Sequence, residues 1–136
     1  MFFKRFRKSP EIPKSELIEQ LSIKDKYLVR TKPWDWLTKN EIYIMSKRDG
    51  QPAMITMDPW PQEIYLHANG QITVANFYDL MCKRYLDSRT AIPELLARTI
   101  IDEITSLLAE QLLECKDEIT LLSSDLANPA SKSLQN

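Results

Sequence analysis

Apolar residues in the second half of the chain recur at helical spacing. One such stretch opens at Thr73, a natural N-cap, and another opens near Pro93, which suits the first turn of a helix. The apolar positions of the two stretches are Val74, Phe77, Leu80, Met81, Tyr85, Leu96, Ile100, Ile101, Ile104, Leu107, Leu108 and Leu112. Each set falls on one helix face, so the pattern predicts helices over about 73–85 and 93–113 with these faces in the core.

Two shorter helices are predicted upstream. Asp58 can cap a helix whose first turn accepts Pro59, and Gly70 supplies the left-handed conformation that ends it. We therefore expect a helix over about 58–70. Residues 15–21 also have a capping serine and apolar positions at helical spacing, which predicts one or two helical turns laid against the body.

The first half of the chain has the pattern of strands. Three short runs, at residues 27–29, 42–45 and 53–57, are rich in apolar, β-branched and aromatic residues. Asp49-Gly50 separates the last two runs and is a strong hairpin signal, because glycine tolerates the positive φ that such turns require. An antiparallel hairpin is therefore expected over residues 41–57.

The segments on either side of these elements have weaker patterns. Trp34 and Trp36 precede the hairpin, and we expect them to cover one open end of the core rather than to stack on a ligand. Residues 119–122 are expected to add a short strand or turn. Residues 123–136 are rich in Ser, Asn and Ala, a composition typical of a loose tail.

Length and composition fit one domain of the α+β class, with antiparallel strands followed by three helices. The chain has 136 residues, 43% of them hydrophobic, which is enough to bury a core without disulfides or metal. We expect this domain at residues 27–122, a basic extension with a short helix at 1–26, and a flexible tail at 123–136. Cys82 and Cys115 lack metal-ligand spacing and are expected to be reduced thiols in a cytoplasmic protein.

Charge is distributed unevenly. Residues 1–40 carry ten Lys or Arg against five Asp or Glu, whereas residues 86–136 carry four against nine. An acidic helical half disfavours nucleic-acid binding, which depends on neutralising phosphates. No apolar run approaches the roughly 20 residues of a membrane span, so none is expected. Aromatic and basic residues alternate over 1–8, which fits either contact with an acidic surface or a frayed terminus.

Residues that carry common catalytic or cofactor chemistry are sparse. His67 is the only histidine, and the chain has only two glycines, too few for a phosphate-binding loop. One histidine and two distant cysteines do not make a metal-ligand set. We therefore expect a non-enzymatic protein without a cofactor or metal.

The turn and capping residues at the junction of strands and helices resemble those of a known family. The stretch TMDPWPQEIYLHANGQITV resembles the PqqD-like family, named for the pyrroloquinoline quinone biosynthesis protein D and also called precursor peptide recognition elements. In that family Leu-Asn ends a strand, Asp-Gly closes the first helix and Thr-Val opens the second. The matching pairs here are Met57-Asp58, Asn69-Gly70 and Thr73-Val74, without gaps between them. The resemblance covers residues 27–122, with an insertion-like stretch at 87–94.

The resemblance implies a winged-helix-like domain that binds a peptide without catalysis. Members of the family bind the leader of a precursor peptide as a strand added beside the third strand, in a groove closed by the third helix, which also implies a modifying enzyme as a partner. The corresponding residues here are Ala53, Met54, Ile55 and Thr56 for the edge and Arg98, Ile101, Asp102 and Thr105 for the wall. Plain core positions are an alternative for the apolar members of this set.

Two other functions fit a chain of this class. A winged-helix regulator would bind DNA, although the third predicted helix has five acidic residues and one Arg between Glu94 and Glu114. A structural component would form a homodimer through a swapped or added strand, which an exposed strand edge makes easy.

Overall fold

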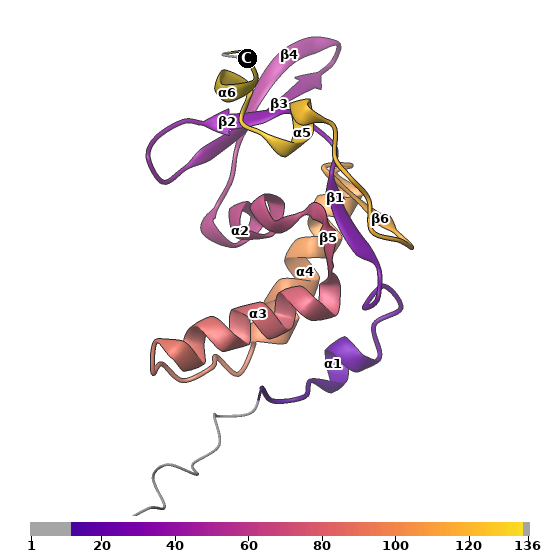
Figure 1. Cartoon of the computed structure of the whole chain (residues 1–136), viewed down its shortest axis with the longest axis vertical. Helices are drawn as coiled ribbons and strands as arrows, with labels where there is room; N and C mark the ends of the chain where they lie inside the picture. The colour runs from indigo at the N-terminus through magenta and orange to yellow at the C-terminus, as the bar shows by residue number, and fades with distance from the viewer. Residues whose placement is uncertain (1–11, 135–136) are drawn as a thin grey trace, which may run out of the picture.

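The computed structural model describes residues 12–134 and contains both helices and antiparallel strands (Figure 1), which confirms the α+β class. In chain order the elements are α1 (Glu16–Glu19), β1 (Tyr27–Arg30), β2 (Trp34–Trp36), β3 (Ile42–Arg48), β4 (Gln51–Thr56), α2 (Pro59–His67), β5 (Asn69–Thr73), α3 (Val74–Asp87), α4 (Leu96–Ala109), β6 (Leu113–Lys116), α5 (Ser124–Ala127) and α6 (Ala130–Leu134). The basic and aromatic segment at residues 1–8 lies outside the described residues.

The strands form two small sheets. The first has the order β2-β3-β4 and is a meander of consecutive strands. The second has the order β5-β1-β6, so β1 pairs with segments far along the chain: Tyr27 lies opposite Thr73 on one side and Lys116 on the other. This second sheet therefore joins the segment before α3 and the segment after α4 to β1, near the start of the domain.

The predicted hairpin is confirmed. β3 and β4 pair antiparallel from Tyr43 opposite Thr56 to Arg48 opposite Gln51. Asp49 and Gly50 form the turn with φ of 53° and 79°. Positive φ at both central residues defines the type I′ turn, whose twist suits two hydrogen-bonded strands.

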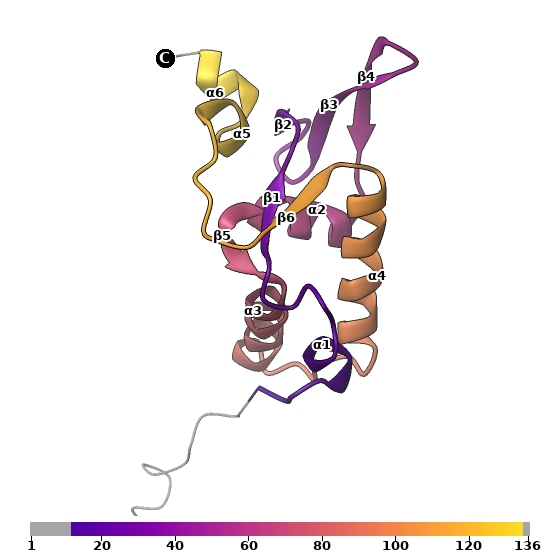
Figure 2. The same ribbon diagram turned by 90° about the vertical axis from the view of Figure 1, so that its right-hand side faces the viewer.

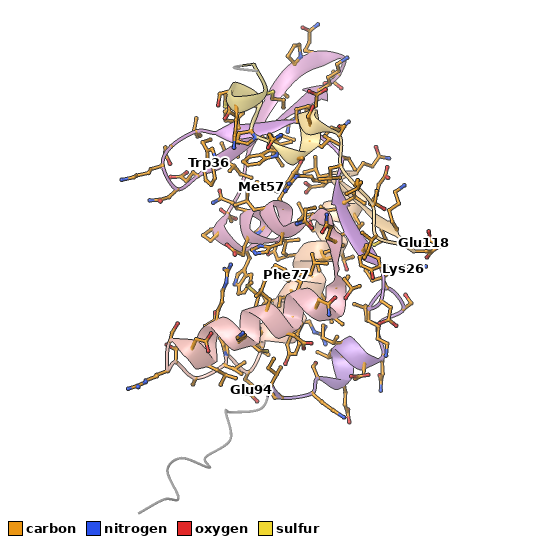
Figure 3. All side chains as sticks on the ribbon, in the orientation of Figure 1. Lys26, Trp36, Met57, Phe77, Glu94 and Glu118 are labelled. Atoms are coloured by element: carbon orange, nitrogen blue, oxygen red, sulfur yellow. The ribbon has the colours of Figure 1, made fainter. Side chains whose placement is uncertain are left out.

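The start of α3 is also confirmed. Thr73 is its N-cap: the hydroxyl of Thr73 accepts from the Asn76 N–H at 3.1 Å, and the Asn76 side chain accepts from the Thr73 N–H at 3.4 Å. The apolar face of α3 packs into the core, and Phe77 points into the space between α2 and α3 (Figure 3). The largest fully buried side chains are Tyr65, Phe77, Leu28, Ile42, Ile44, Ile64, Ile100, Ile104 and Leu113.

The helices predicted over 58–70 and 93–113 are shorter than expected. α2 begins after Asp58 but ends at His67, and Gly70, with φ of 82°, lies in β5 instead of closing the helix. α4 begins at Leu96 because Pro93 lies in a preceding turn, and it ends at Ala109. Shortly beyond its last turn the backbone at Gln111 adopts φ of 63°, which redirects the chain into β6.

The expectations for the flanking segments have different outcomes: the strand or turn over residues 119–122 is wrong, whereas the helical turn within residues 15–21 is confirmed. Trp34 and Trp36 belong to strand β2, which pairs with β3. Trp34 lies in the core, and Trp36 is 43% exposed. Residues 119–122 form no strand, since the partner edge of β1 is already taken by the earlier β6. α1 is confirmed as a single turn capped by Ser15, and it packs on α3 and α4.

The C-terminal segment is not a loose tail. α5 and α6 fold back beside β2, on the side away from β3 and β4 (Figure 2). The Leu126 carbonyl accepts from the Arg30 guanidinium at 2.7 Å and from the Trp34 indole N–H at 3.0 Å. The Ser131 hydroxyl donates to the Asp35 carboxylate at 2.9 Å. Donors and acceptors 92 to 96 residues upstream thus hold a segment whose own composition suggests disorder.

Candidate functional site

Strand β4 forms an open edge of the first sheet. Within residues 12–134, β4 pairs with β3 alone. The backbone N–H and C=O groups on its other side have no partner strand. An unpaired edge presents a row of N–H and C=O groups to solvent, which is a template for another strand.

The turn geometry determines which residues face outward along this edge. A two-residue turn makes Arg48 and Gln51 a hydrogen-bonded pair, and such pairs then alternate along the ladder. Ala53 and Ile55 therefore direct their backbone groups toward β3, whereas Met54 and Thr56 direct theirs outward.

Two observations agree with this alternation. The Met45 N–H, opposite Met54, donates to the Pro33 carbonyl at 2.9 Å and so points away from β4. Pro52, which has no N–H, occupies an outward position, where the ladder with β3 needs no donor. The outward hydrogen-bonding groups of the edge are therefore those of Met54 and Thr56, together with the Pro52 carbonyl.

Side chains of β4 alternate between the core face and the outer face of the sheet. Ala53 and Ile55 are half-buried, and Ile55 packs against the core beside Ile44. Met54 is 60% exposed and lies opposite Met45 on the outer face of the sheet. A large thioether side chain exposed on an edge strand adds an adaptable apolar contact to the backbone groups.

The two edges of the sheet differ. Beside β2, the segment that contains α5 and α6 is held through Trp34 and Asp35, whereas β4 has no such cover among the described residues. Natural sheets commonly cover their edges with a helix or loop. The contrast singles out β4 as the accessible edge.

The predicted wall residues lie on one flank of α4. Arg98, Asp102 and Thr105 are exposed, and Ile101 is half-buried against the core. α4 packs mainly on α2, α1 and β6, while β4 packs mainly on β3. The structure thus places the eight predicted residues in two groups, four on β4 and four on α4. The two groups do not pack extensively against each other.

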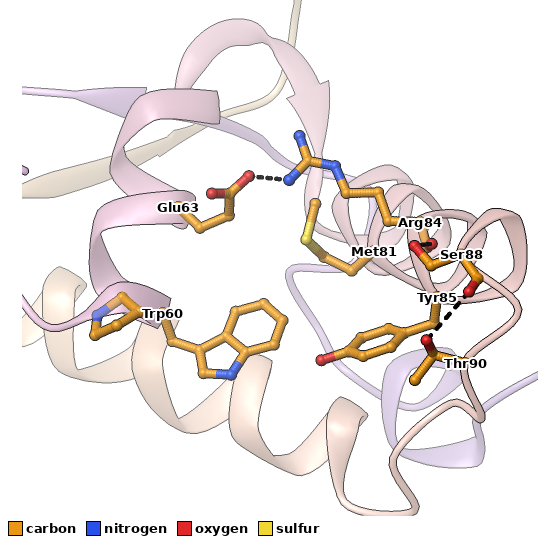
Figure 4. A pocket seen from close by; sticks show the side chains of 8 residues that line it. Trp60, Glu63, Met81, Arg84, Tyr85, Ser88 and Thr90 are labelled. Carbon is orange, nitrogen blue, oxygen red and sulfur yellow. Dashed lines mark hydrogen bonds and ion pairs between the residues drawn. The ribbon is translucent and has the colours of Figure 1, made fainter. Parts of the chain in front are cut away.

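A cavity that sequence reasoning did not predict lies between α2 and α3 (Figure 4). Its volume is ≈ 330 Å³. Its lining residues are Pro59, Trp60, Glu63, Met81, Arg84, Tyr85, Ser88 and Thr90. Met81 and Tyr85 were recognisable as one apolar helix face, but nothing in the sequence aligned that face with Trp60 of another helix.

A polar cluster borders this cavity. The carboxylate of Glu63 forms an ion pair with Arg84 and lies 3.5 Å from His67 Nδ1. His67 Nε2 lies 3.4 Å from an Arg84 guanidinium nitrogen, and its ring packs edge-to-face on Phe77 at 5.5 Å. These interactions join α2 to α3 and occupy the charged groups at the rim.

The thiols and the acidic groups show no metal-binding arrangement. Within residues 12–134, no group of three or more His, Cys, Asp or Glu side chains is placed to hold a metal ion. Cys82 and Cys115 are free, and burial raises the pKa of both thiols, which lowers their thiolate fraction. The same part of the chain contains no helix with the length and hydropathy to cross a bilayer.

The fold and the open edge define a small α+β domain with an accessible β-strand. Comparison of the chain with protein-family models, with curated proteins and with solved structures finds no match in any of the three.

Proposed function

We propose that this chain is a non-catalytic module that binds a peptide or a protein segment as an additional strand on β4. The observation that carries the proposal is the contrast between the edges of one sheet: helices lie beside β2, while β4 leaves the outward backbone groups of Met54 and Thr56 without a partner in the described part of the chain. Strand addition uses such groups for affinity and alternate side-chain contacts for specificity.

The resemblance of residues 27–122 to PqqD-like domains supports the same function. Under it, the partner is a precursor peptide, its modifying enzyme is a second partner, and the fold is a winged-helix-like variant in the cytoplasm. Met54 and Thr56 would form backbone hydrogen bonds with the peptide, and Ala53 and Ile55 would anchor β4 to the core. The exposed flank of α4 would border the peptide on the side away from β4.

Assembly through two copies of the same edge is the second candidate. An antiparallel pairing of β4 with β4 of another copy would satisfy the same backbone groups in a symmetric homodimer. DNA binding has less support, because α4 presents Arg98 as its only basic residue alongside Asp102 and Glu103.

Amide spectra of the full chain test the proposal. We expect synthetic peptides encoded by genes adjacent to the gene for this chain to shift the amide signals of Met54 and Thr56, and to shift those of Ala53 and Ile55 less. If every such peptide leaves the two outward amides unmoved, strand addition is excluded for this group of partners. Shifts that depend on protein concentration alone would instead assign the edge to a second copy.

Substitution of Met54 separates backbone pairing from side-chain contact. Met54→Pro removes an outward N–H without touching the ladder to β3, and Met54→Val removes the thioether but keeps the N–H. We expect Met54→Pro to weaken peptide binding about tenfold or more relative to Met54→Val, because it removes a main-chain hydrogen bond and restricts the edge. Equal affinities of the two variants would contradict pairing at this position.

A further inference from the structure

The cavity between α2 and α3 has the chemistry of a site for an aromatic side chain. Trp60 and Tyr85 face each other across it, and Met81 contributes to its inner wall (Figure 4). Both rings are half-buried, and Met81 is 3% exposed. Aromatic rings and a thioether provide a large apolar contact with favourable ring and sulfur geometry for another ring.

The size and rim of the cavity narrow the choice of occupant. At ≈ 330 Å³ it is at the lower end of the range of ligand pockets, so it suits one ring and not a large cofactor. The Glu63 carboxylate is already paired with Arg84, and the Ser88 hydroxyl donates to the Arg84 carbonyl at 2.7 Å. Because these groups have partners, an uncharged occupant fits better than an ion.

The chain connects this cavity directly to the open edge. Thr56 is the last residue of β4, and Pro59, the first residue of α2, belongs to the cavity wall. Three residue steps of extended chain span at most roughly 11 Å. A strand paired with β4 that continues past Thr56 would therefore need only about three or four further residues to reach the cavity.

We propose that the cavity holds an aromatic anchor residue of the same peptide that adds to β4. This inference rests on the proposed function and makes it more specific: the partner has an extended segment for the edge and, about three or four residues beyond the segment, a Trp, Phe or Tyr for the cavity. Buried aromatic anchors in pockets commonly dominate the energy of such interfaces.

Methionine methyl groups report on the two sites separately. Met54 lies on the edge and Met81 lines the cavity, so the full chain labelled with ¹³C at its methionine methyls gives one signal for each. The probes are N-acetyl-tryptophanamide and peptides selected from a random phage-displayed library on the immobilised full chain. We expect the amide to shift Met81 alone, and selected peptides to shift both Met81 and Met54.

Each outcome has a different consequence. Peptides that shift Met54 and leave Met81 unmoved would overturn the anchor while leaving strand addition intact. Peptides that shift Met81 alone, or a library that yields no binder, would overturn strand addition and the anchor that rests on it. In a supporting result, replacing the aromatic residue of a selected peptide by Ala weakens binding about tenfold or more.

Paired tryptophan variants provide the matched control. Trp60→Ala removes a cavity wall, while Trp36→Ala removes a 43% exposed ring from β2. We expect Trp60→Ala to weaken a selected peptide about tenfold and Trp36→Ala to change its affinity less than about twofold. Tyr85→Ala repeats the test from α3 if Trp60→Ala fails to fold. Equal effects of the cavity and control variants would overturn the anchor.

Discussion

Gly70 and Thr120 pack backbone against backbone. The Thr120 N–H donates to the Gly70 carbonyl at 2.9 Å, and a Cβ on residue 70 would lie 2.0 Å from the Thr120 carbonyl oxygen. This contact holds the segment after β6 against β5. Gly70 is therefore required within a strand because a side chain at this position would collide with the backbone of Thr120.

Replacing Gly70 should therefore be far more costly than replacing the other glycine. Gly70→Ala combines a positive φ, which costs an L-residue about 1–2 kcal/mol, with the contact to Thr120, so we expect the free energy of unfolding to fall by about 3 kcal/mol or more. Gly50→Ala has a similar φ and nothing within 4 Å, so it should lose only about 1–2 kcal/mol. Urea denaturation measures both, and equal losses would contradict the close approach.

Arg30 is a second buried structural residue, 5% exposed and bonded to backbone carbonyls. Its acceptors are the carbonyl oxygens of Tyr65, Leu66, Leu126 and Ala127, at 2.9, 3.0, 2.7 and 3.4 Å. Its guanidinium also lies 5.4 Å from the centroid of the Trp34 ring, and burial lowers its pKa. One side chain thus joins the end of α2 to α5.

Arg30→Met should detach the C-terminal segment. The substitution removes four hydrogen bonds of a buried guanidinium, although the Tyr65 carbonyl keeps the Ala68 N–H and the Leu126 carbonyl keeps the Trp34 indole as donors. We therefore expect the free energy of unfolding to fall by about 2–4 kcal/mol, with faster amide exchange at residues 124–128. Arg48→Met, at the exposed end of β3, is the matched control and should change stability by less than about 0.5 kcal/mol. Unchanged exchange in Arg30→Met would show that other contacts hold α5.

Tyr65 makes stability depend on pH in the alkaline range. Its ring is fully buried, its hydroxyl donates to the Lys32 carbonyl at 2.6 Å, and desolvation raises the pKa of Tyr65 to about 12. The unfolded chain ionises near the ordinary value of 10.0, so it releases a proton that the folded chain retains. The stability that comes from the raised pKa of Tyr65 is therefore fully present below pH 10 and is lost as the pH rises toward 12.

Tyr65→Phe should remove part of this alkaline loss. Desolvation also raises the pKa of Tyr78 to about 12, so Tyr78→Phe should remove another part of the slope. The double variant should keep the part that comes from Cys82 and Cys115, because burial raises the pKa of these thiols as well. Urea denaturation between about pH 9 and pH 11.5, with tyrosinate absorbance recorded in parallel, measures the slope. If Tyr65→Phe keeps the wild-type slope, Tyr65 does not retain its proton in the folded state.

Local signals in the sequence predicted the elements that depend on local contacts. Asp49-Gly50 produced the expected hairpin because both residues form the turn themselves, and Thr73 produced the expected start of α3 because it caps its own helix. β5, β6 and the docked C-terminal segment were missed. Each depends on partners far along the chain, such as Tyr27 for Lys116 and Arg30 for Leu126, which periodicity cannot reveal.

The candidate site was predictable to a similar extent. The hairpin fixed the position of β4, and its turn type allows the outward residues Met54 and Thr56 to be worked out. The relation of this strand to α4, and the cavity formed by Trp60 and Tyr85, depend on how helices pack across the core. Sequence spacing places residues on one face of a helix but does not give the neighbour of that face.

Proline substitutions on β4 test the backbone alternation on which the site depends. Ala53→Pro removes an N–H that bonds to β3, so we expect it to lower the free energy of unfolding by about 3 kcal/mol or more. Met54→Pro removes an outward N–H, as Pro52 already does at the preceding outward position, and should cost less than about 1 kcal/mol. Urea denaturation of both variants gives the comparison. If Met54→Pro is the more damaging variant, the ladder is shifted by one residue, the outward groups belong to Ala53 and Ile55, and the exposed Met54 side chain no longer marks the pairing edge.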